Sequence, residues 1–291
     1  MTLRGRVLVA VLIGALALCV AGCRRVGPDQ MRRDFVALRY VQEAQEVLSR
    51  RPMDRPRAVA RLDRAMELAP DEHTVSQLAP GLYLEAGEYA KALALLEKEP
   101  GADPFMLGQC MVKTGRKEEG AELLVQTAED ANRAFRAGVV GSYVYAMRMN
   151  NAGYVLADAG VELNQAKSFL EIATDELPLD TNCVDSLGWL YYRMGRFREA
   201  VFLLERAVRQ QTAAKQPDVY YHLGAAYARL GNDRRARKML AAALRMDPTH
   251  AASQDELRRL QWALPHASLA CADASIHDQA AGPCTAAIHG G

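Results

Sequence analysis

The side chains of this 291-residue chain that could do chemistry lie mainly near its two ends. Near the C-terminus, Ser275, His277 and Asp278 supply a nucleophile, a base and a carboxylate, as a serine hydrolase does. They lie in a small, polar, unpatterned segment that offers no scaffold to hold catalytic geometry, so we interpret the grouping as chance. The sequence has no GxSxG, HExxH or Walker motif, and no GxGxxG on a strand. We therefore expect no enzyme activity, no catalytic residue, no cofactor and no metal.

The six cysteines form three groups by position, and none lies in a CxxC or CxxCH motif. Cys110 and Cys183 fall inside helical patterns and are expected to be ordinary buried thiols. Cys271 and Cys284 lie in the segment 265–291, which we expect to be a disordered tail. A disulfide between these two and a pair of free thiols both stay open, and a metal site with nearby histidines is the less favoured alternative.

The first 23 residues indicate an export signal that ends in a site for chemical modification. Arg4 and Arg6 precede the apolar run 7–20, which is shorter than the roughly 20 residues of a membrane-spanning helix. The run leads into Val-Ala-Gly-Cys, ending at Cys23, which resembles the lipobox of bacterial lipoproteins. The resemblance implies that residues 1–22 are a signal peptide and that the Cys23 thiol is lipidated. The alternative is a generic signal peptide, or an uncleaved anchor, in which this cysteine is incidental.

A lipid anchor at Cys23 predicts a location in the cell envelope, outside the cytoplasm. In the lipoprotein family, Asp after the lipidated cysteine favours retention in the inner membrane. Arg24 stands there instead, which favours the periplasmic face of the outer membrane if the organism has one. The arginine-rich segment 23–38 is expected to be a solvated tether, with contact between its arginines and anionic head groups as the alternative.

Composition indicates a soluble, folding chain and gives no reason to expect a nucleic-acid partner. Half of the residues are apolar and 24% are charged. The 36 basic and 35 acidic residues give a formal net charge of +1, so no broad attraction to nucleic acid is expected.

Two stretches of the chain repeat one pattern, and this pattern predicts the elements that must position any functional side chain. Residues 185–208 and 221–244 align Leu with Leu, Gly with Gly, Tyr with Tyr and Ala with Ala, with Leu187 and Leu223 36 residues apart. The units that start at Thr181 and Pro217 resemble tetratricopeptide repeats (TPR), whose period is about 34 residues. The resemblance implies two antiparallel helices in each unit, which cross closely at a Gly and an Ala.

Weaker copies of the pattern precede these two units. We therefore predict an all-α fold, a TPR-type α-solenoid of about six helix-turn-helix units over residues 39–264. A capping helix at 251–264 with one polar side would close the stack. The pattern leaves the repeat register open between residues 129 and 146.

The TPR resemblance implies a binding site for a protein or peptide on the concave face, which the first helix of each unit forms. Aromatic, amide and charged side chains fall at the implied positions, and Trp, Tyr and Arg are typical interface anchors. The alternative is that these side chains pack against the neighbouring helix. His222 is interpreted as a packed or surface residue rather than a catalytic base. The candidate partner-binding residues are Asn150, Tyr154, Asp185, Trp189, Tyr192, Arg193, Tyr221 and Arg229.

These observations favour a non-enzymatic adaptor that is lipid-anchored outside the cytoplasm and holds a protein or peptide partner near a membrane. The family resemblance implies roles in envelope, secretion or pilus assembly. A second hypothesis is an accessory subunit that organises an envelope enzyme modifying polysaccharide or peptidoglycan. A third is an enzyme with an unrecognised site.

Overall fold

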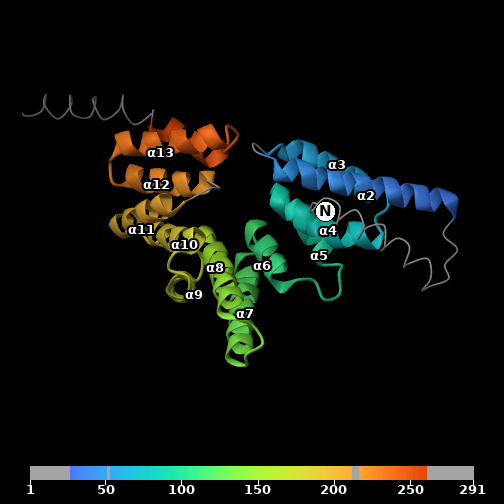
Figure 1. Ribbon diagram of the computed structural model, residues 1–291, viewed down its shortest axis with the longest axis horizontal. Coiled ribbons are helices and arrows are strands. Elements are labelled where there is room, and N and C mark those ends of the chain that lie inside the picture. The colour runs from blue at the N-terminus through green and yellow to red at the C-terminus, as the bar shows by residue number, and fades with distance from the viewer. Residues whose placement is uncertain (1–26, 51–52, 212–215, 261–291) are drawn as a thin grey trace, which may run out of the picture.

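The computed structural model describes residues 27–50, 53–211 and 216–260, which are helices joined by turns, with no strand in these ranges. The predicted all-α class is therefore confirmed (Figure 1). Twelve labelled helices pair into six antiparallel hairpins. The pairs are α2 (Pro28–Ser49) with α3 (Arg55–Leu68), α4 (His73–Ala86) with α5 (Tyr89–Leu96), α6 (Pro104–Lys113) with α7 (Lys117–Arg136), α8 (Ser142–Ala159) with α9 (Leu163–Glu176), α10 (Thr181–Arg193) with α11 (Phe197–Gln210), and α12 (Pro217–Arg229) with α13 (Asp233–Met246).

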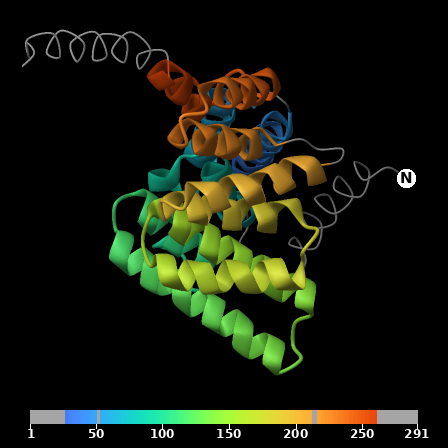
Figure 2. The same cartoon turned by 90° about the vertical axis from the view of Figure 1, so that its left-hand side faces the viewer.

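The hairpins stack in chain order, as a solenoid requires. The second helix of each hairpin packs against the first helix of the next, and α6, α8, α10 and α12 also pack in sequence against one another. Figures 1 and 2 show the resulting curved stack, with α2–α5 forming one arm and α10–α13 the other. A last helix over 251–260 follows α13 and packs Leu260 into the core, as expected of a cap.

The small residues of the repeat mark the places where two helices cross. A Cβ atom at Gly224 would lie 2.8 Å from Leu240 Cγ, and one at Gly188 would lie 2.8 Å from Leu204 Cγ. Both distances are shorter than any ordinary carbon contact, so glycine is required there. Gly231 has a φ of 72° just after α12, the left-handed conformation with which many helices end.

The predicted tether over 23–38 is wrong for its described part, because α2 begins at Pro28 rather than near residue 39. Pro28 occupies the first helical turn, where its fixed φ suits helix initiation, and Asp29 complements the helix dipole. Ala37 and Val41 then bury one face of α2 against the core, so the helix is anchored from its third turn onward. The solenoid therefore starts at its N-terminal end with a long helix.

The segment of open register, 129–146, runs from the end of α7, the second helix of one hairpin, to the start of α8, the first helix of the next. Helix α7 has 20 residues and α8 has 18, whereas α9 and α10 have 14 and 13. The rings of Phe135 and Tyr145 stack at 4.4 Å across the extension. The repeat pattern fades here because both helices are longer than the repeat requires, and their added turns pack on each other between two neighbouring units.

Several sequence-based expectations lie outside the described residues. They concern the signal peptide, Cys23, the tail 265–291 with its two cysteines, and the Ser-His-Asp grouping.

Candidate functional site

The first helices of the later hairpins bring polar and aromatic side chains together on one surface, called here the first-helix face and formed by α6, α8, α10 and α12. Asp158, near the end of α8, lies at its centre. Its carboxylate accepts hydrogen bonds from Trp189 Nε1, at 3.1 Å, and from the Lys113 ammonium group. Arg193 donates to the Asp158 backbone carbonyl. One acidic residue thus connects α6, α8 and α10.

An aromatic stack extends from this carboxylate toward α12. The Trp189 ring stacks on Tyr192 at 4.6 Å, with 6° between the planes, and on His222 at 4.2 Å. Tyr221 approaches Trp189 at 5.7 Å. Parallel rings at these distances hold each other in place, so α10 and α12 present a rigid aromatic surface.

A buried ion pair lies beneath the stack. His222 Nδ1 is 2.9 Å from Asp185 Oδ2, and both side chains are almost fully buried. Burial, the largest single cause, would lower the pKa of His222, but the carboxylates of Asp185, Asp218 and Asp158 together outweigh it, and the pKa lies above its ordinary value. Burial, the largest single cause, would raise the pKa of Asp158, but the hydrogen bonds from Lys113 and Trp189 and the charges of Lys113 and Arg193 together outweigh it, and the pKa is lowered. The charged forms of His222 and Asp158 are therefore both stabilised by the groups that pair with them.

Two buried oxygen atoms on this face have no hydrogen-bond partner among the described residues. They are Asn150 Oδ1 on α8 and Asp185 Oδ1 on α10. Asn150 is 5% exposed and Asp185 is 6% exposed. An unpaired buried acceptor costs about 1–3 kcal/mol, so an N–H donor that reached these atoms by displacing the covering side chains would be stabilised.

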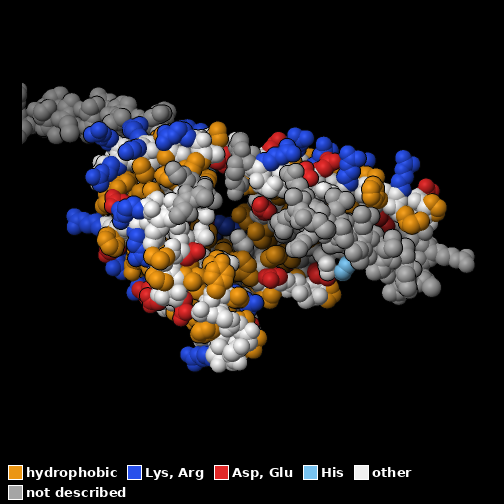
Figure 3. All heavy atoms as spheres, viewed as in Figure 1, with side chains coloured by type: hydrophobic (Ala, Val, Ile, Leu, Met, Phe, Trp, Pro, Cys, Tyr) orange, Lys and Arg blue, Asp and Glu red, His pale blue; other side chains and the backbone are white. Residues whose placement is uncertain are grey.

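The first-helix face is opposed by the other arm of the solenoid. The pKa of Asp218 on α12 is lowered mainly by its hydrogen bond with His250, and also by the charge of Arg55 on α3. Lys113 lies 5.9 Å above the ring of Tyr89 on α5. Figure 3 shows a hollow between the two arms, with hydrophobic side chains on its floor. A chain segment entering this hollow would meet both arms.

The structure brings most of the candidate residues together. Asp185, Trp189, Tyr192, Arg193 and Tyr221 lie in the cluster around Asp158 and His222, with Tyr154 at its edge, 6.3 Å from the His222 ring.

Burial divides these candidates into two groups. Trp189 is 4% exposed, and Asp185 and Asn150 are equally buried, so the packing alternative describes these three. Tyr154, Tyr192, Arg193 and Tyr221 are half-buried and keep part of their surface open.

Arg229 is exposed but lies apart from the cluster, over the ring of Phe197 at 4.8 Å. Three further members of the network were not among the sequence-based candidates: Lys113, His222 and His250. His222 pairs with an acid 37 positions earlier, one repeat plus one residue. This spacing could have indicated the pair from the sequence, because residues about one repeat apart lie on neighbouring first helices.

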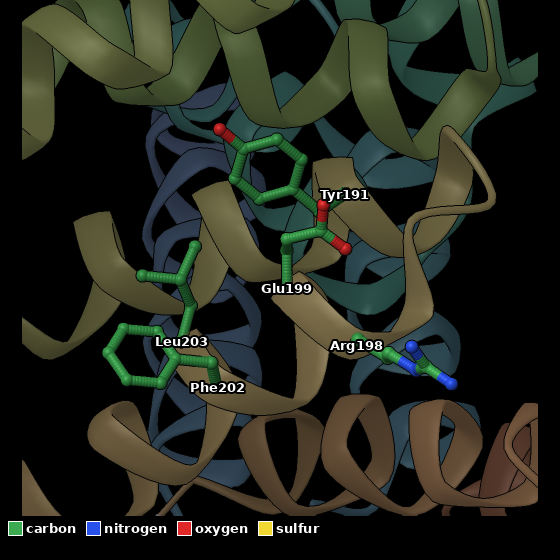
Figure 4. Close-up of a pocket in the computed structure, with 5 residues that line it drawn as sticks. All are labelled: Tyr191, Arg198, Glu199, Phe202 and Leu203. Atoms are coloured by element: carbon green, nitrogen blue, oxygen red, sulfur yellow. The ribbon is translucent and has the colours of Figure 1, made fainter.

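A second, shallow hollow of about 360 Å³ lies over α10 and α11. Figure 4 shows Phe202 and Leu203 side by side, with Tyr191 across from them and Arg198 at the far end. Phe202 is 67% exposed. Most of the exposed lining is apolar, although Arg198 and Glu199 also line the hollow, so it offers mainly apolar contact area.

The described part of the chain holds neither a group of three or more potential metal ligands nor a helix with the length and apolar character needed to cross a membrane. Cys110 and Cys183 are buried free thiols, as expected. Burial raises the pKa of Cys110 to about 11 and that of Cys183 to about 12, so both stay protonated.

Comparisons with known proteins support the repeat family. Residues 191–260 match the family model described as tetratricopeptide repeat. The chain is similar to the TPR repeat-containing protein PA4667 of Pseudomonas aeruginosa, with 37% identity over 81 residues. That match covers 27% of this chain and only 13% of the relative.

Solved structures with helical similarity have low identity and low TM-scores. PilW, described as a widely conserved type IV pilus biogenesis factor, has 16% identity and a TM-score of 0.44, over 76% of this chain and 98% of its own. MamA AMB-1 has 23% identity and a TM-score of 0.40, over 56% and 92%. YrrB, described as a TPR protein with an unusual peptide-binding site, has 21% identity and a TM-score of 0.36, over 78% and 93%.

Proposed function

We propose that this chain is an adaptor that is lipid-anchored through Cys23 outside the cytoplasm and binds an extended segment of a partner protein on its first-helix face. The observation that carries the binding proposal is the aromatic stack of α10 and α12, in which Tyr192 and Tyr221 stay half-buried beside the buried Trp189. Asn150 Oδ1 and Asp185 Oδ1 are covered acceptors without a partner among the described residues, and a peptide N–H would pair with them where the covering side chains move aside. The lipid anchor is supported by the sequence pattern at residues 20–23.

The half-buried rings offer a contact surface for a partner side chain. Tyr192 and Tyr221 flank the buried Trp189, so a partner side chain that lies on their open sides would contact rings already held in place. Burial raises the pKa of Tyr221 to about 12, so its hydroxyl group is a neutral donor at physiological pH. Because the stack is held before binding, little side-chain entropy is lost on association.

A pull-down from membranes with chemical crosslinking tests the proposal. The variant is the double substitution Tyr192→Ala with Tyr221→Ala, which leaves the buried Trp189 in place. The matched control is Phe202→Ala, which removes an equally large aromatic ring from the opposite, second-helix side. We expect one partner to be captured by the wild type and the control and lost from the folded double variant.

The identity of the captured partner distinguishes the roles. A structural component of an envelope, secretion or pilus assembly supports the adaptor role. An enzyme that modifies polysaccharide or peptidoglycan supports the accessory-subunit role. Equal capture by the double variant and the wild type contradicts binding on the first-helix face.

A further inference from the structure

The first turns of α2 present apolar side chains to solvent. Met31 is 51% exposed and Phe35 is 70% exposed. Four residues apart, they lie one above the other on the helix. Arg32 and Arg39, seven residues apart, form the adjacent stripe and are also exposed. Helix α2 thus carries an outward face of two large apolar groups edged by two arginines, called here the α2 face.

The α2 face is not part of the solenoid core. The buried side of α2 begins only at Ala37 and continues through Val41 and Ala44. In Figure 1 the first turns of α2 reach beyond α3, where the rest of the stack does not cover them. Substitutions in this face therefore remove little packing from the fold.

The distance to the lipid attachment site is short because the helix starts early. Only four peptide units separate Cys23 from Gly27, the residue before α2, and they span at most about 15 Å. Met31 lies a further 6 Å or so along the helix, at about 1.5 Å per residue. Wherever Cys23 is anchored, the α2 face stays within a few nanometres of that membrane surface.

The charge of this segment suits an anionic surface. Residues 24–39 contain five arginines and two aspartates, a net charge of +3, whereas the whole chain carries +1. Exposed apolar side chains beside arginines are typical of helices that lie in a lipid interface, with the apolar groups immersed and the guanidinium groups at the head groups.

We propose that the α2 face docks on an anionic lipid bilayer, with Met31 and Phe35 inserted at the acyl boundary and Arg32 and Arg39 at the head groups. The inference rests on the proposed anchor at Cys23. Two attachments, the lipid and the helix, fix the orientation of the solenoid on the membrane. The first-helix face then has a set direction relative to the surface.

Lipid quenching of a fluorophore at position 35 tests the proposal. The full chain carries Cys271→Ser and Cys284→Ser, with Phe35→Cys labelled by an environment-sensitive dye. It is reconstituted into vesicles of phosphatidylglycerol and phosphatidylethanolamine that contain lipids with a nitroxide group on the acyl chain. The matched control is Leu179→Cys in the same background, because Leu179 is 81% exposed on the body of the solenoid. Metabolic labelling with palmitate is measured on the same chain.

The expected result is palmitate incorporation and quenching several-fold stronger at position 35 than at position 179. Palmitate incorporation with equal quenching at both positions overturns the docking proposal and leaves the anchor intact. Absence of palmitate overturns the anchor, and the docking proposal with it. A dye at position 35 that is shielded from both the lipid quencher and aqueous iodide indicates a protein surface there and also overturns docking on lipid.

Discussion

Replacing Asn150 by leucine should change the stability of the fold and the affinity for the partner in opposite directions. The Asn150 side chain is buried, and its Oδ1 atom has no partner among the described residues. Leucine has the same branching at Cγ and brings no acceptor. Removing an unpaired buried acceptor recovers about 1–3 kcal/mol, and the slightly larger side chain offsets part of this gain. We expect a net gain of about 1 kcal/mol, or a rise in Tm of about 2–4 °C for a domain of this size.

Binding should change in the opposite direction. A hydrogen bond from the partner to Asn150 Oδ1 contributes about 0.5–1.5 kcal/mol, so its loss weakens the Kd roughly 2- to 12-fold. Differential scanning calorimetry measures the first effect, and titration with the captured partner segment measures the second. A more stable protein that binds less well is the pattern expected where a site is maintained at the expense of stability.

The matched control for this prediction is Asn150→Asp, which keeps the shape and places a buried charge without a partner. We expect it to lower the Tm, because an uncompensated buried carboxylate is strongly unfavourable. A fall in Tm for Asn150→Leu, or an unchanged Kd, would refute the reasoning, because it would show that the amide holds the fold together and not the partner.

Three further outcomes are expected. Gly224→Leu should destabilise the fold by about 1–3 kcal/mol or more in a thermal melt, because its Cβ would already lie 2.8 Å from Leu240 Cγ. The folded protein raises the pKa of His222, so the stability that this residue contributes is complete below the unfolded pKa of 6.5 and is lost as pH rises through the folded pKa. His222→Gln should therefore flatten the fall in unfolding free energy above pH 6.5, measured by urea titration. Cys23→Ser should abolish palmitate incorporation and release the chain from membranes.

For each of these three predictions, one result would contradict the reasoning. A melting curve for Gly224→Leu like that of the wild type would show that the helices do not cross at this residue. If the unfolding free energies of the wild type and His222→Gln fall in parallel as pH rises, the ion pair between His222 and Asp185 does not cause the fall. If the Cys23→Ser chain still partitions into membranes, an uncleaved anchor rather than a lipid holds it there.

Sequence reasoning reached the repeat because its signals are local. A glycine at a helix crossing, such as Gly188, and a glycine with a left-handed turn conformation, such as Gly231, are required by contacts within one hairpin. These residues and the weaker copies of the same pattern therefore indicated about six hairpins, with the register left open between residues 129 and 146. The start of α2 was missed because the repeat pattern begins only where the helix meets the core, near Ala37.

The site was harder to predict because it forms between repeats. Position within a unit places Trp189 on the first-helix face, but only the distance to the next unit shows that His222 covers it. Asp158 likewise acquires its role from Lys113 on one side and Trp189 on the other. These contacts depend on how far each hairpin rotates against its neighbour, which residue types do not specify.

The most direct test of the central claim is site-specific photocrosslinking in intact membranes. A photoreactive phenylalanine analogue at position 221 stands on the first-helix face, and one at position 202 stands on the second-helix side. We expect a single protein adduct from position 221 and none of the same mass from position 202. An adduct that forms at 202 and not at 221 would contradict the account and move the binding surface to α11.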